Sequence, residues 1–315
     1  MKILITGAQG QLGHDVHSLL SRSHTVYALN SRDLDISDRQ AVESTVRLLR
    51  PELLINCAAY TAVDNCEKET ERAWAVNARG PEHLARAMEA EEGRMIHIST
   101  DYVFAGDKVA GESYFEEDQV APLSEYGRSK LAGEEAVQAI SSDHLILRTA
   151  WLYGLHGKNF LKTMLRLTLA NPTRQLKVVN DQYGSLTWTA TLARQIEVVL
   201  AADLQGVAHA TAEGFSTWYQ GACYFLEAME IPHNLVPCST AEYPTPAHRP
   251  ANSILENRRL KEADLAVFPS WQEDIDTFVR NHRSLLLEEA DRRLRQQFAR
   301  MPAGRDVVAM AMGKF

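Results

Sequence analysis

Cysteine is scarce in this sequence, which contains only Cys57, Cys66, Cys223 and Cys238 among 315 residues. No two of them have the Cys-x-x-Cys spacing of zinc and redox sites, and the chain has no acidic cluster, so we expect no metal centre. A disulfide scaffold is also excluded, because a chain of this length can bury a full core without covalent support. We therefore expect a cytoplasmic protein.

Long apolar runs and an excess of positive charge are also missing. No run approaches the roughly 18 residues that a membrane span requires, and the opening Met-Lys-Ile-Leu-Ile-Thr-Gly is too short for a signal peptide. The 33 Lys and Arg residues are outnumbered by 41 Asp and Glu residues, which gives a net charge of −8. Proteins that bind nucleic acids or anionic membranes usually carry a basic face, so this balance argues against both partners.

Short apolar runs alternate with stretches of helical periodicity in the first half of the chain. The strand-like runs are 2–6, 25–29, 53–57, 95–100 and 144–149. Continuous apolar strands separated by helices are typical of a parallel sheet that is covered on both faces. We therefore predict an α/β protein in which residues 1–148 form a Rossmann-type, doubly wound parallel sheet. Ligands of such sheets bind at the carboxyl ends of the strands.

The second half of the chain is less regular, with proline-rich turns at 171–172 and 243–250. We assign residues 149–284 to a smaller α+β substrate-binding portion, some of whose segments can return to the Rossmann core. Residues 285–315 follow as a charged C-terminal tail with a helical pattern.

A glycine-rich turn, Gly7-Ala8-Gln9-Gly10-Gln11-Leu12-Gly13, comes directly after the first strand. Glycines at this spacing allow a tight turn and bring the free N–H groups of the next helix close to a pyrophosphate. A strand before the turn and a helix after it are the context that a dinucleotide-binding motif requires, whereas the glycines alone would also fit a structural turn. We expect a nicotinamide dinucleotide to bind at Gly7, Gly10, Gln11, Leu12 and Gly13.

The residues after the second strand bear on the choice between NADPH and NADH. A carboxylate there would bind the adenosine ribose 2′-hydroxyl, whereas an arginine can neutralise a 2′-phosphate. Asn30 and Arg32 occupy these positions and favour NADPH, and Asp33 lies close enough to keep NADH as the alternative.

A phenol and an ammonium lie four residues apart in Tyr126-Gly127-Arg128-Ser129-Lys130, where a helical pattern begins. At this spacing both side chains project from one face of a helix. A neighbouring ammonium favours the phenolate, so we predict that Lys130 lowers the pKa of Tyr126 and makes it a usable proton donor and acceptor. Upstream, the strand 95–100 ends in Thr100, which can donate a hydrogen bond to a substrate carbonyl or, alternatively, only terminate the strand.

These motifs resemble the extended short-chain dehydrogenase/reductase family over about residues 1–284. The resemblance rests on 7–13, 56–64, 76–80, 99–104 and 126–130. Three further segments, 148–154, 180–184 and 243–253, resemble the members of this family that reduce dTDP-sugars. The resemblance implies NAD(P)H-dependent reduction of the C4 keto group of dTDP-4-dehydro-6-deoxy-L-mannose to dTDP-L-rhamnose, for surface polysaccharide synthesis.

The resemblance also implies roles for individual residues. Tyr126 would protonate the oxygen at C4, Lys130 would hold the nicotinamide ribose, and Thr100 would orient the carbonyl. The remaining cofactor contacts, at the pyrophosphate, the adenine and the path to the nicotinamide, would be made by Gly10, Gln11, Leu12, Asp35, Ile36, Ala58, Ala59 and Tyr60. The sugar nucleotide would contact Asp101, Tyr102, Trp151 and Arg249. Arg249 would bind its diphosphate, because a guanidinium matches phosphate geometry, or would serve a structural role instead.

Other functions on the same fold stay open at this point. The family's dehydratases follow the strand-end threonine with Asp-Glu, whereas this chain has Asp101-Tyr102 and lacks that glutamate. A ketoreductase that makes a different epimer, an epimerase, and a non-catalytic NAD(P)-binding regulatory subunit are the alternatives, and a homodimer is left open. We interpret the acidic loop between Thr100 and Tyr126 as a mobile flap.

Overall fold

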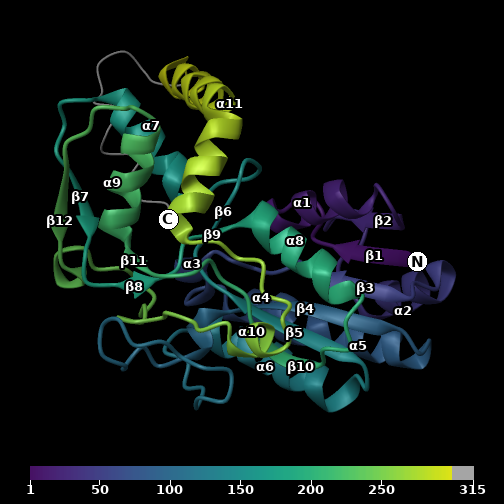
Figure 1. The fold of residues 1–315 in the computed structure, drawn as a ribbon. Helices are drawn as coiled ribbons and strands as arrows, with labels where there is room; N and C mark the ends of the chain where they lie inside the picture. The colour runs from purple at the N-terminus through teal and green to yellow at the C-terminus, as the bar shows by residue number, and fades with distance from the viewer. Residues whose placement is uncertain (300–315) are drawn as a thin grey trace.

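A six-stranded parallel sheet forms the centre of the computed structural model, which describes residues 1–299 (Figure 1). Its strand order is β10-β5-β4-β3-β1-β2, and each neighbouring pair is parallel. The strands are β1 (Lys2–Thr6), β2 (Thr25–Leu29), β3 (Leu53–Asn56), β4 (Arg94–Thr100), β5 (His144–Thr149) and β10 (Gly206–His209). The predicted fold class is confirmed, and the apolar sequences of β1 and β3 follow from burial on both faces.

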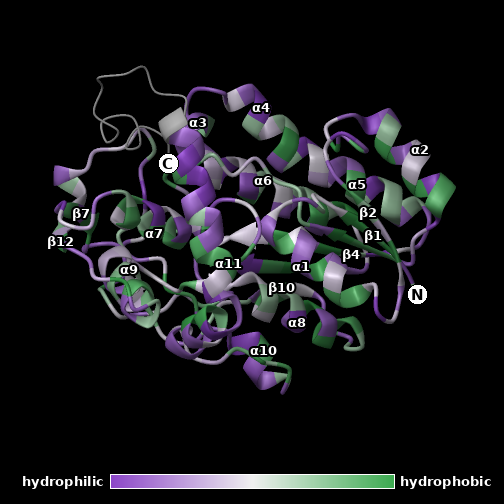
Figure 2. Ribbon diagram, turned by 90° about the horizontal axis from the view of Figure 1, so that it is seen from above, coloured by the Kyte–Doolittle hydropathy of each residue, from purple (hydrophilic) through white to green (hydrophobic). Residues whose placement is uncertain are grey.

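Helices from distant parts of the chain cover the two faces of this sheet. On one face, α1 (Gln11–Leu20) packs against α8 (Thr189–Leu200), and Val16 and Ile196 share one core. The opposite face is covered by α2 (Arg39–Leu49), α5 (Gly80–Ala90) and α6 (Glu125–Ile140). Figure 2 shows hydrophobic residues concentrated on the strands between these layers. Both α8 and β10 come from the 149–284 region, so this region contributes a helix and the edge strand to the Rossmann layers.

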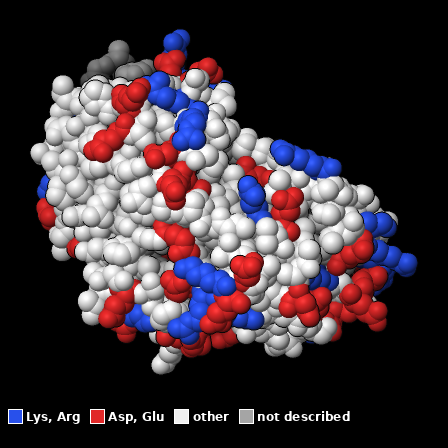
Figure 3. Space-filling model, in the orientation of Figure 1, with Lys and Arg blue, Asp and Glu red and all other residues white. Residues whose placement is uncertain are grey.

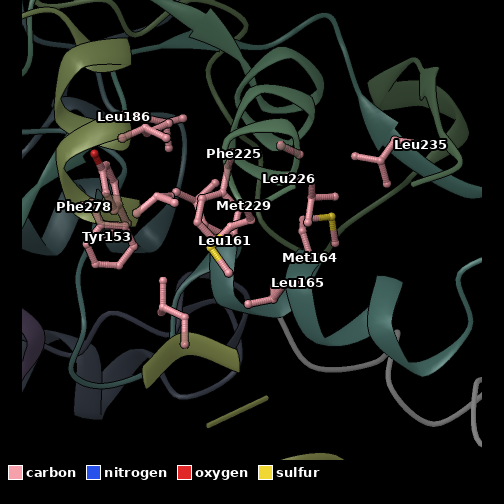
Figure 4. Close-up of a cluster of buried hydrophobic side chains, with 14 of the residues drawn as sticks. Tyr153, Leu161, Met164, Leu165, Leu186, Phe225, Leu226, Met229, Leu235 and Phe278 are labelled. Carbon is pink, nitrogen blue, oxygen red and sulfur yellow. The ribbon is translucent and has the colours of Figure 1, made fainter. Parts of the chain in front are cut away.

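A second core lies beyond the carboxyl ends of the strands. It is built on α7 (Phe160–Ala170), α9 (Trp218–Ala228) and α11 (Trp271–Ala299), and Figure 4 shows side chains such as Leu161, Phe225 and Phe278 packed together there. Three two-stranded sheets border it: β7 (Leu176–Val179) with β12 (Leu235–Cys238), β8 (Tyr183–Gly184) with β11 (Ser216–Thr217), and β6 (Leu152–Tyr153) with β9 (Thr187–Trp188).

Short helical turns connect the larger elements. They are α3 (Val63–Cys66), α4 (Thr70–Trp74), the π-helical turn η1 (Ala75–Arg79), the 3₁₀ turns η2 (Asp101–Val103) and η3 (Thr240–Glu242), and α10 (Arg258–Glu262). The turns α3 to η1 carry the chain from β3 to α5, and η2 begins where β4 ends.

The segment expected as a charged tail begins inside a helix. Helix α11 starts at Trp271, and beyond residue 285 it still buries Leu286 and Ala290. Glu289 forms an ion pair with Lys162 of α7 at 2.6 Å. Residues 285–299 are therefore packed on the second core, and the rest of the expected tail, 300–315, lies outside the described residues.

The acidic loop between β4 and α6 is held against the body of the protein. The N–H of Tyr114 donates to the carbonyl of Ile254 at 2.7 Å, and the Tyr114 ring stacks on Phe104. The Glu116 carboxylate accepts hydrogen bonds from the backbone N–H groups of His209 and Arg259 at 3.0 and 3.2 Å. These contacts argue against the predicted mobile flap, because Glu116 and Tyr114 bind the loop to the backbone of other segments.

Within residues 1–299, every helix is too short or too polar to cross a membrane. In the view of Figure 3, acidic and basic side chains are interspersed over the surface. This face offers no single basic area of the kind that binds nucleic acids.

Candidate active site

A cavity of about 640 Å³ opens at the carboxyl ends of β3, β4 and β5, beside the glycine turn that follows β1. Its wall includes the glycine turn, the ends of β3, β4 and β5, the first turns of α6, the segment 157–159 and Trp218. The cavity therefore lies between the Rossmann layers and the second core, where open α/β sheets bind their ligands. Of the predicted residues, it brings together Gly10, Gln11, Leu12, Gly13, Ala59, Thr100, Asp101, Tyr102, Tyr126, Lys130 and Trp151.

The glycine turn depends on its missing side chains. Gly7 has φ of +69°, and a Cβ atom there would lie 2.6 Å from the backbone nitrogen of Ala58. A Cβ atom on Gly13 would overlap the carbonyl oxygen of Gly7. Gly7 is therefore needed for the shape of the turn, and it stands behind the cavity wall together with Ala58. No side chain caps α1 at Gly10, so the N–H groups of its first turn are available to a phosphate, and this chain's residues fit a dinucleotide pyrophosphate.

The residues expected around the adenosine lie next to this turn and outside the cavity wall. The side chain of Asp33 accepts hydrogen bonds from the backbone and side chain of Asn30, and the Asn30 Oδ1 accepts the N–H of Arg32 at 2.8 Å. This turn engages the carboxylate of Asp33 and leaves the Arg32 side chain exposed. Ile36 is buried against Gly80, and the exposed Asp35 accepts hydrogen bonds from Ser37.

Tyr60 also stands outside the cavity wall, and a buried asparagine holds its backbone. The N–H of Tyr60 donates to Asn77 Oδ1 at 2.8 Å, and Asn77 Nδ2 donates to the Tyr60 carbonyl at 3.1 Å. The same amide donates to Ser129 Oγ of α6 at 3.1 Å. Asn77 therefore ties the segment after β3 to the helix that carries Tyr126 and Lys130. The sequence analysis included this residue in the segment 76–80 but predicted no role for it.

The predicted tyrosine and lysine lie one turn apart in α6, and both side chains line the cavity. Ser124 caps this helix by accepting the N–H of Gly127 at 3.2 Å. Tyr126 is 9% exposed and Lys130 is 2% exposed. Thr100 ends β4 beside them, and its hydroxyl donates to Asp101 Oδ1 at 3.0 Å. The geometry thus gathers a phenol, an ammonium and a hydroxyl on one wall.

Burial changes the acid–base behaviour of these groups. It raises the pKa of Tyr126 above its ordinary value and lowers the pKa of Lys130 to about 8. The Lys130 Nζ donates to the carbonyl of Ile98 at 2.7 Å, so the ammonium is directed at β4. The prediction that Lys130 lowers the pKa of Tyr126 is therefore wrong, because desolvation of the buried phenolate is the largest influence on this pKa and raises it. Burial also raises the pKa of Asp101 to about 6.

A chain of buried polar side chains lies beneath Lys130, and the sequence reasoning missed it as well. Thr6 donates to Asn56 Oδ1 at 2.7 Å, Asn56 Nδ2 lies 3.0 Å from His97 Nδ1, and His97 Nε2 lies 3.4 Å from Lys130 Nζ. The signals in the sequence were Asn56, which ends β3 and opens the segment 56–64, and His97, a polar residue inside the apolar strand β4.

The second core contributes aromatic rings and a guanidinium. Trp151 has φ of +45° and stacks on Trp218, with ring centroids 3.6 Å apart. Arg249 binds both carboxylate oxygens of Asp64, at 3.0 and 2.9 Å, and so links the two portions of the chain. Arg249 lies outside the large cavity and lines a second, mainly apolar cavity of about 210 Å³. Trp218 lines both cavities, so they adjoin.

Among residues 1–299, one group of side chains has a composition and spacing that suit a metal ion. The ligand atoms of His14, Asp15 and His156 lie within 4.8 Å of one another. However, the two imidazole rings are stacked, with centroids 3.4 Å and planes 23° apart. A nitrogen lone pair lies in the plane of its ring, and stacked rings do not share a plane. One ion could not bind both rings in this arrangement, so we assign no metal to the group.

Comparison with known proteins agrees with this site. The model of the RmlD substrate binding domain matches residues 1–284. The dTDP-4-dehydrorhamnose reductase of Escherichia coli is 41% identical over 287 residues, which cover 86% of this chain and 95% of that protein. The protein of the same name from Mycobacterium tuberculosis H37Rv is 41% identical over 282 residues, covering 88% and 91%.

Solved structures give the same result. A dTDP-4-dehydrorhamnose reductase from Clostridium acetobutylicum is 40% identical, with a TM-score of 0.85 over 89% of this chain and 99% of that chain. The enzyme of that name from Bacillus anthracis, solved in complex with NADP, is 37% identical with the same coverage and TM-score. A Thermus thermophilus UDP-glucose 4-epimerase, 21% identical with a TM-score of 0.77, shares the fold alone. Since the family match and these likenesses extend over most of the chain, this protein belongs to the RmlD substrate binding domain family, and the resemblance to the extended short-chain dehydrogenases is confirmed.

Proposed function

We propose that this protein is an NADPH-dependent oxidoreductase that reduces the C4 keto group of dTDP-4-dehydro-6-deoxy-L-mannose to dTDP-L-rhamnose. The observation that carries the proposal is the arrangement of Thr100, Tyr126 and Lys130 on one wall of a cavity whose neighbouring wall is the glycine turn. Relatives about 40% identical that carry the name dTDP-4-dehydrorhamnose reductase support it, and one of them was solved with NADP.

The cofactor is held by backbone groups and a few side chains of this chain. Gly10, Gln11 and Leu12 bind its pyrophosphate through the uncapped start of α1, and Arg32 binds the 2′-phosphate with Asn30 beside it. Asp35 and Ile36 lie at the adenine, and Ala58, Ala59 and Tyr60 line the path to the nicotinamide. Bound NADPH supplies a hydride to C4.

The protein supplies the proton that completes the reduction. Tyr126 donates its hydroxyl proton to the oxygen at C4. The Thr100 hydroxyl, which donates to Asp101 Oδ1 in this structure, turns its one proton to that oxygen and orients it. Reduction requires the protonated phenol, and burial favours this form because it raises the pKa of Tyr126. Lys130, with a pKa of about 8, is mostly an ammonium at neutral pH and holds the nicotinamide ribose.

The nucleotide of the substrate occupies the second cavity, between the stacked Trp151 and Trp218 and the apolar wall beyond them. Arg249 stands at the wall of that cavity, and we assign the diphosphate to its guanidinium. The Asp64 carboxylate already neutralises this guanidinium, so the diphosphate shares Arg249 with Asp64. Asp101 and Tyr102 contact the sugar.

The test is the consumption of NADPH by purified protein with dTDP-4-keto-6-deoxyglucose, followed by the loss of reduced-nicotinamide absorbance. The keto-sugar is supplied with and without the C3,C5-epimerase that makes the rhamnose precursor. We expect stoichiometric NADPH consumption only when the epimerase is present, with dTDP-L-rhamnose as the product. Consumption without the epimerase would indicate a ketoreductase that makes a different epimer. No consumption in either arm would refute the proposal in favour of an epimerase or a binding subunit.

A further inference from the structure

The chain of buried side chains beneath Lys130 runs across three strands and a helix. Thr6 ends β1, Asn56 ends β3, His97 lies within β4, and Lys130 belongs to α6. All four residues are buried, with at most 2% of their surface exposed. In such an environment each N–H and lone pair needs a partner, so the hydrogen-bond directions can be worked out from the atoms present.

The backbone fixes the orientation of the Asn56 amide. The N–H of Ala58, which can only donate, lies 3.1 Å from Asn56 Oδ1, and the Thr6 hydroxyl donates to the same oxygen at 2.7 Å. The Nδ2 group of Asn56 must therefore be the atom that faces His97 at 3.0 Å. Since Nδ2 is a donor, His97 Nδ1 accepts the hydrogen bond and carries no proton.

A neutral imidazole with a bare Nδ1 carries its proton on Nε2. That N–H faces the Nζ atom of Lys130 at 3.4 Å, while Nζ also donates to the Ile98 carbonyl at 2.7 Å. An N–H group can donate to the lone pair of an amine. An ammonium has no lone pair, so the N–H group of His97 and an N–H group of Lys130 would point at each other and repel. The contact therefore favours the amine form of Lys130.

We propose that His97, held by Asn56 in the Nε2–H tautomer, is a positioning residue that directs Lys130 to the Ile98 carbonyl and disfavours its ammonium form. This inference rests on the proposed function, because it assigns His97 an effect on the group that holds the cofactor ribose. His97 is fully buried and does not line the cavity, so it acts through Lys130.

The ionisable groups that act on Lys130 work in the opposite direction to His97, whereas burial works in the same direction. The carboxylate of Glu134, on the same helix, and the thiol of Cys57, after β3, both raise the pKa of Lys130, whereas burial lowers it to about 8. Glu134 is itself paired with the buried Arg148 at 2.7 Å. Tyr126 and Asp101 share the cavity wall with Lys130. Burial and Lys130 both lower the pKa of His97 well below its ordinary value, so His97 stays neutral throughout the pH range in which Lys130 titrates.

The decisive variant is His97→Asn. The Oδ1 atom of asparagine can replace Nδ1 as the acceptor for Asn56, while the group that faces Lys130 is removed. His209→Asn is the matched control, because His209 is also a fully buried, neutral histidine of the same sheet, and its Nδ1 contacts the Glu256 carbonyl away from the cavity. NADPH affinity is measured by fluorescence titration between pH 7 and pH 10, and no sugar is needed for this readout.

We expect the affinity of the wild type for NADPH to fall above about pH 8, as Lys130 loses its proton. The pH at which this fall begins is the break in the binding profile. His97→Asn should move this break upward by roughly half a pH unit, so that at pH 9 it binds NADPH about threefold more tightly than the wild type. His97→Gln, whose amide nitrogen can replace Nε2–H, should restore the wild-type break, and His209→Asn should leave it unchanged. An unmoved break in a folded His97→Asn variant would overturn the proposal.

The wild type provides a second test that does not depend on the folding of a variant. In protein with ¹⁵N-labelled histidine, the imidazole shifts of His97 should indicate a protonated Nε2 and a bare Nδ1 from pH 7 to pH 9. The opposite tautomer would refute the inference. A shifted break in NADPH binding without turnover of any keto-sugar would instead contradict the proposed function and leave the role of His97 standing.

Discussion

Replacing Asp101 by asparagine should make the stability of the protein less sensitive to pH. Asp101 is 2% exposed, and burial raises its pKa from 3.8 to about 6. The folded protein therefore binds this proton more tightly than the unfolded chain, and stability falls as the pH rises from about 4 to about 6. A shift of about two pKa units corresponds to about 3 kcal/mol, which the ionised carboxylate costs the folded state at pH 8.

The asparagine side chain in the Asp101→Asn variant would keep the acceptor for the Thr100 hydroxyl but would not titrate. The substitution has costs of its own, such as a new buried NH₂ group, but these do not depend on pH. The informative quantity is therefore the change in unfolding free energy on Asp101→Asn at pH 8 minus that at pH 5. With a pKa of 3.8 in the unfolded chain and about 6 in the folded protein, proton linkage gives about 1.4 kcal/mol for this difference. The variant is therefore expected to gain about that much stability relative to the wild type between pH 5 and pH 8.

Urea unfolding at both pH values, followed by tryptophan fluorescence, measures this difference. Asp274→Asn is the matched comparison, because burial also raises the pKa of Asp274 to about 6 and its carboxylate accepts the Thr191 hydroxyl at 2.7 Å, away from the cavity. We expect a similar pH dependence for both variants, with loss of turnover only for Asp101→Asn. A difference near zero for Asp101→Asn would refute the argument that burial governs this carboxyl.

Three further substitutions test other parts of the site. Tyr126→Phe should bind NADPH as the wild type does and lose about 10² to 10⁴-fold in kcat, because it lacks the proton that completes the reduction. Wild-type turnover of NADPH by this variant would refute the proposed mechanism. Arg32→Ala should weaken NADPH binding and leave NADH binding nearly unchanged, which parallel titrations would check, and an equal loss for both would rule out a 2′-phosphate contact. Glu134→Gln should lower the unfolding free energy by about 3 to 5 kcal/mol, because it leaves the buried Arg148 guanidinium without its counter-charge. An unchanged denaturation midpoint would contradict that reasoning.

The features that depend on near neighbours along the chain could be predicted from the residues alone. The apolar strands followed from burial on both faces, and the glycine turn followed from positions such as Gly7, where a positive φ and close backbone packing require glycine. The Tyr-x-x-x-Lys spacing placed Tyr126 and Lys130 on one face of a helix before any contact was known. The parallel sheet then implied that Thr100 and the glycine turn would meet at its carboxyl edge.

What these groups contact depends on the packing of distant segments. The edge strand β10 comes from far along the chain, and the pair between Asp64 and Arg249 joins residues 185 positions apart, so no local pattern could announce either. The pKa of Tyr126 followed burial because desolvation is set by everything packed around the phenol, whereas the sequence showed only one neighbouring charge. For the same reason, the path from Thr6 through Asn56 and His97 to Lys130 exists only once three strands and a helix lie side by side.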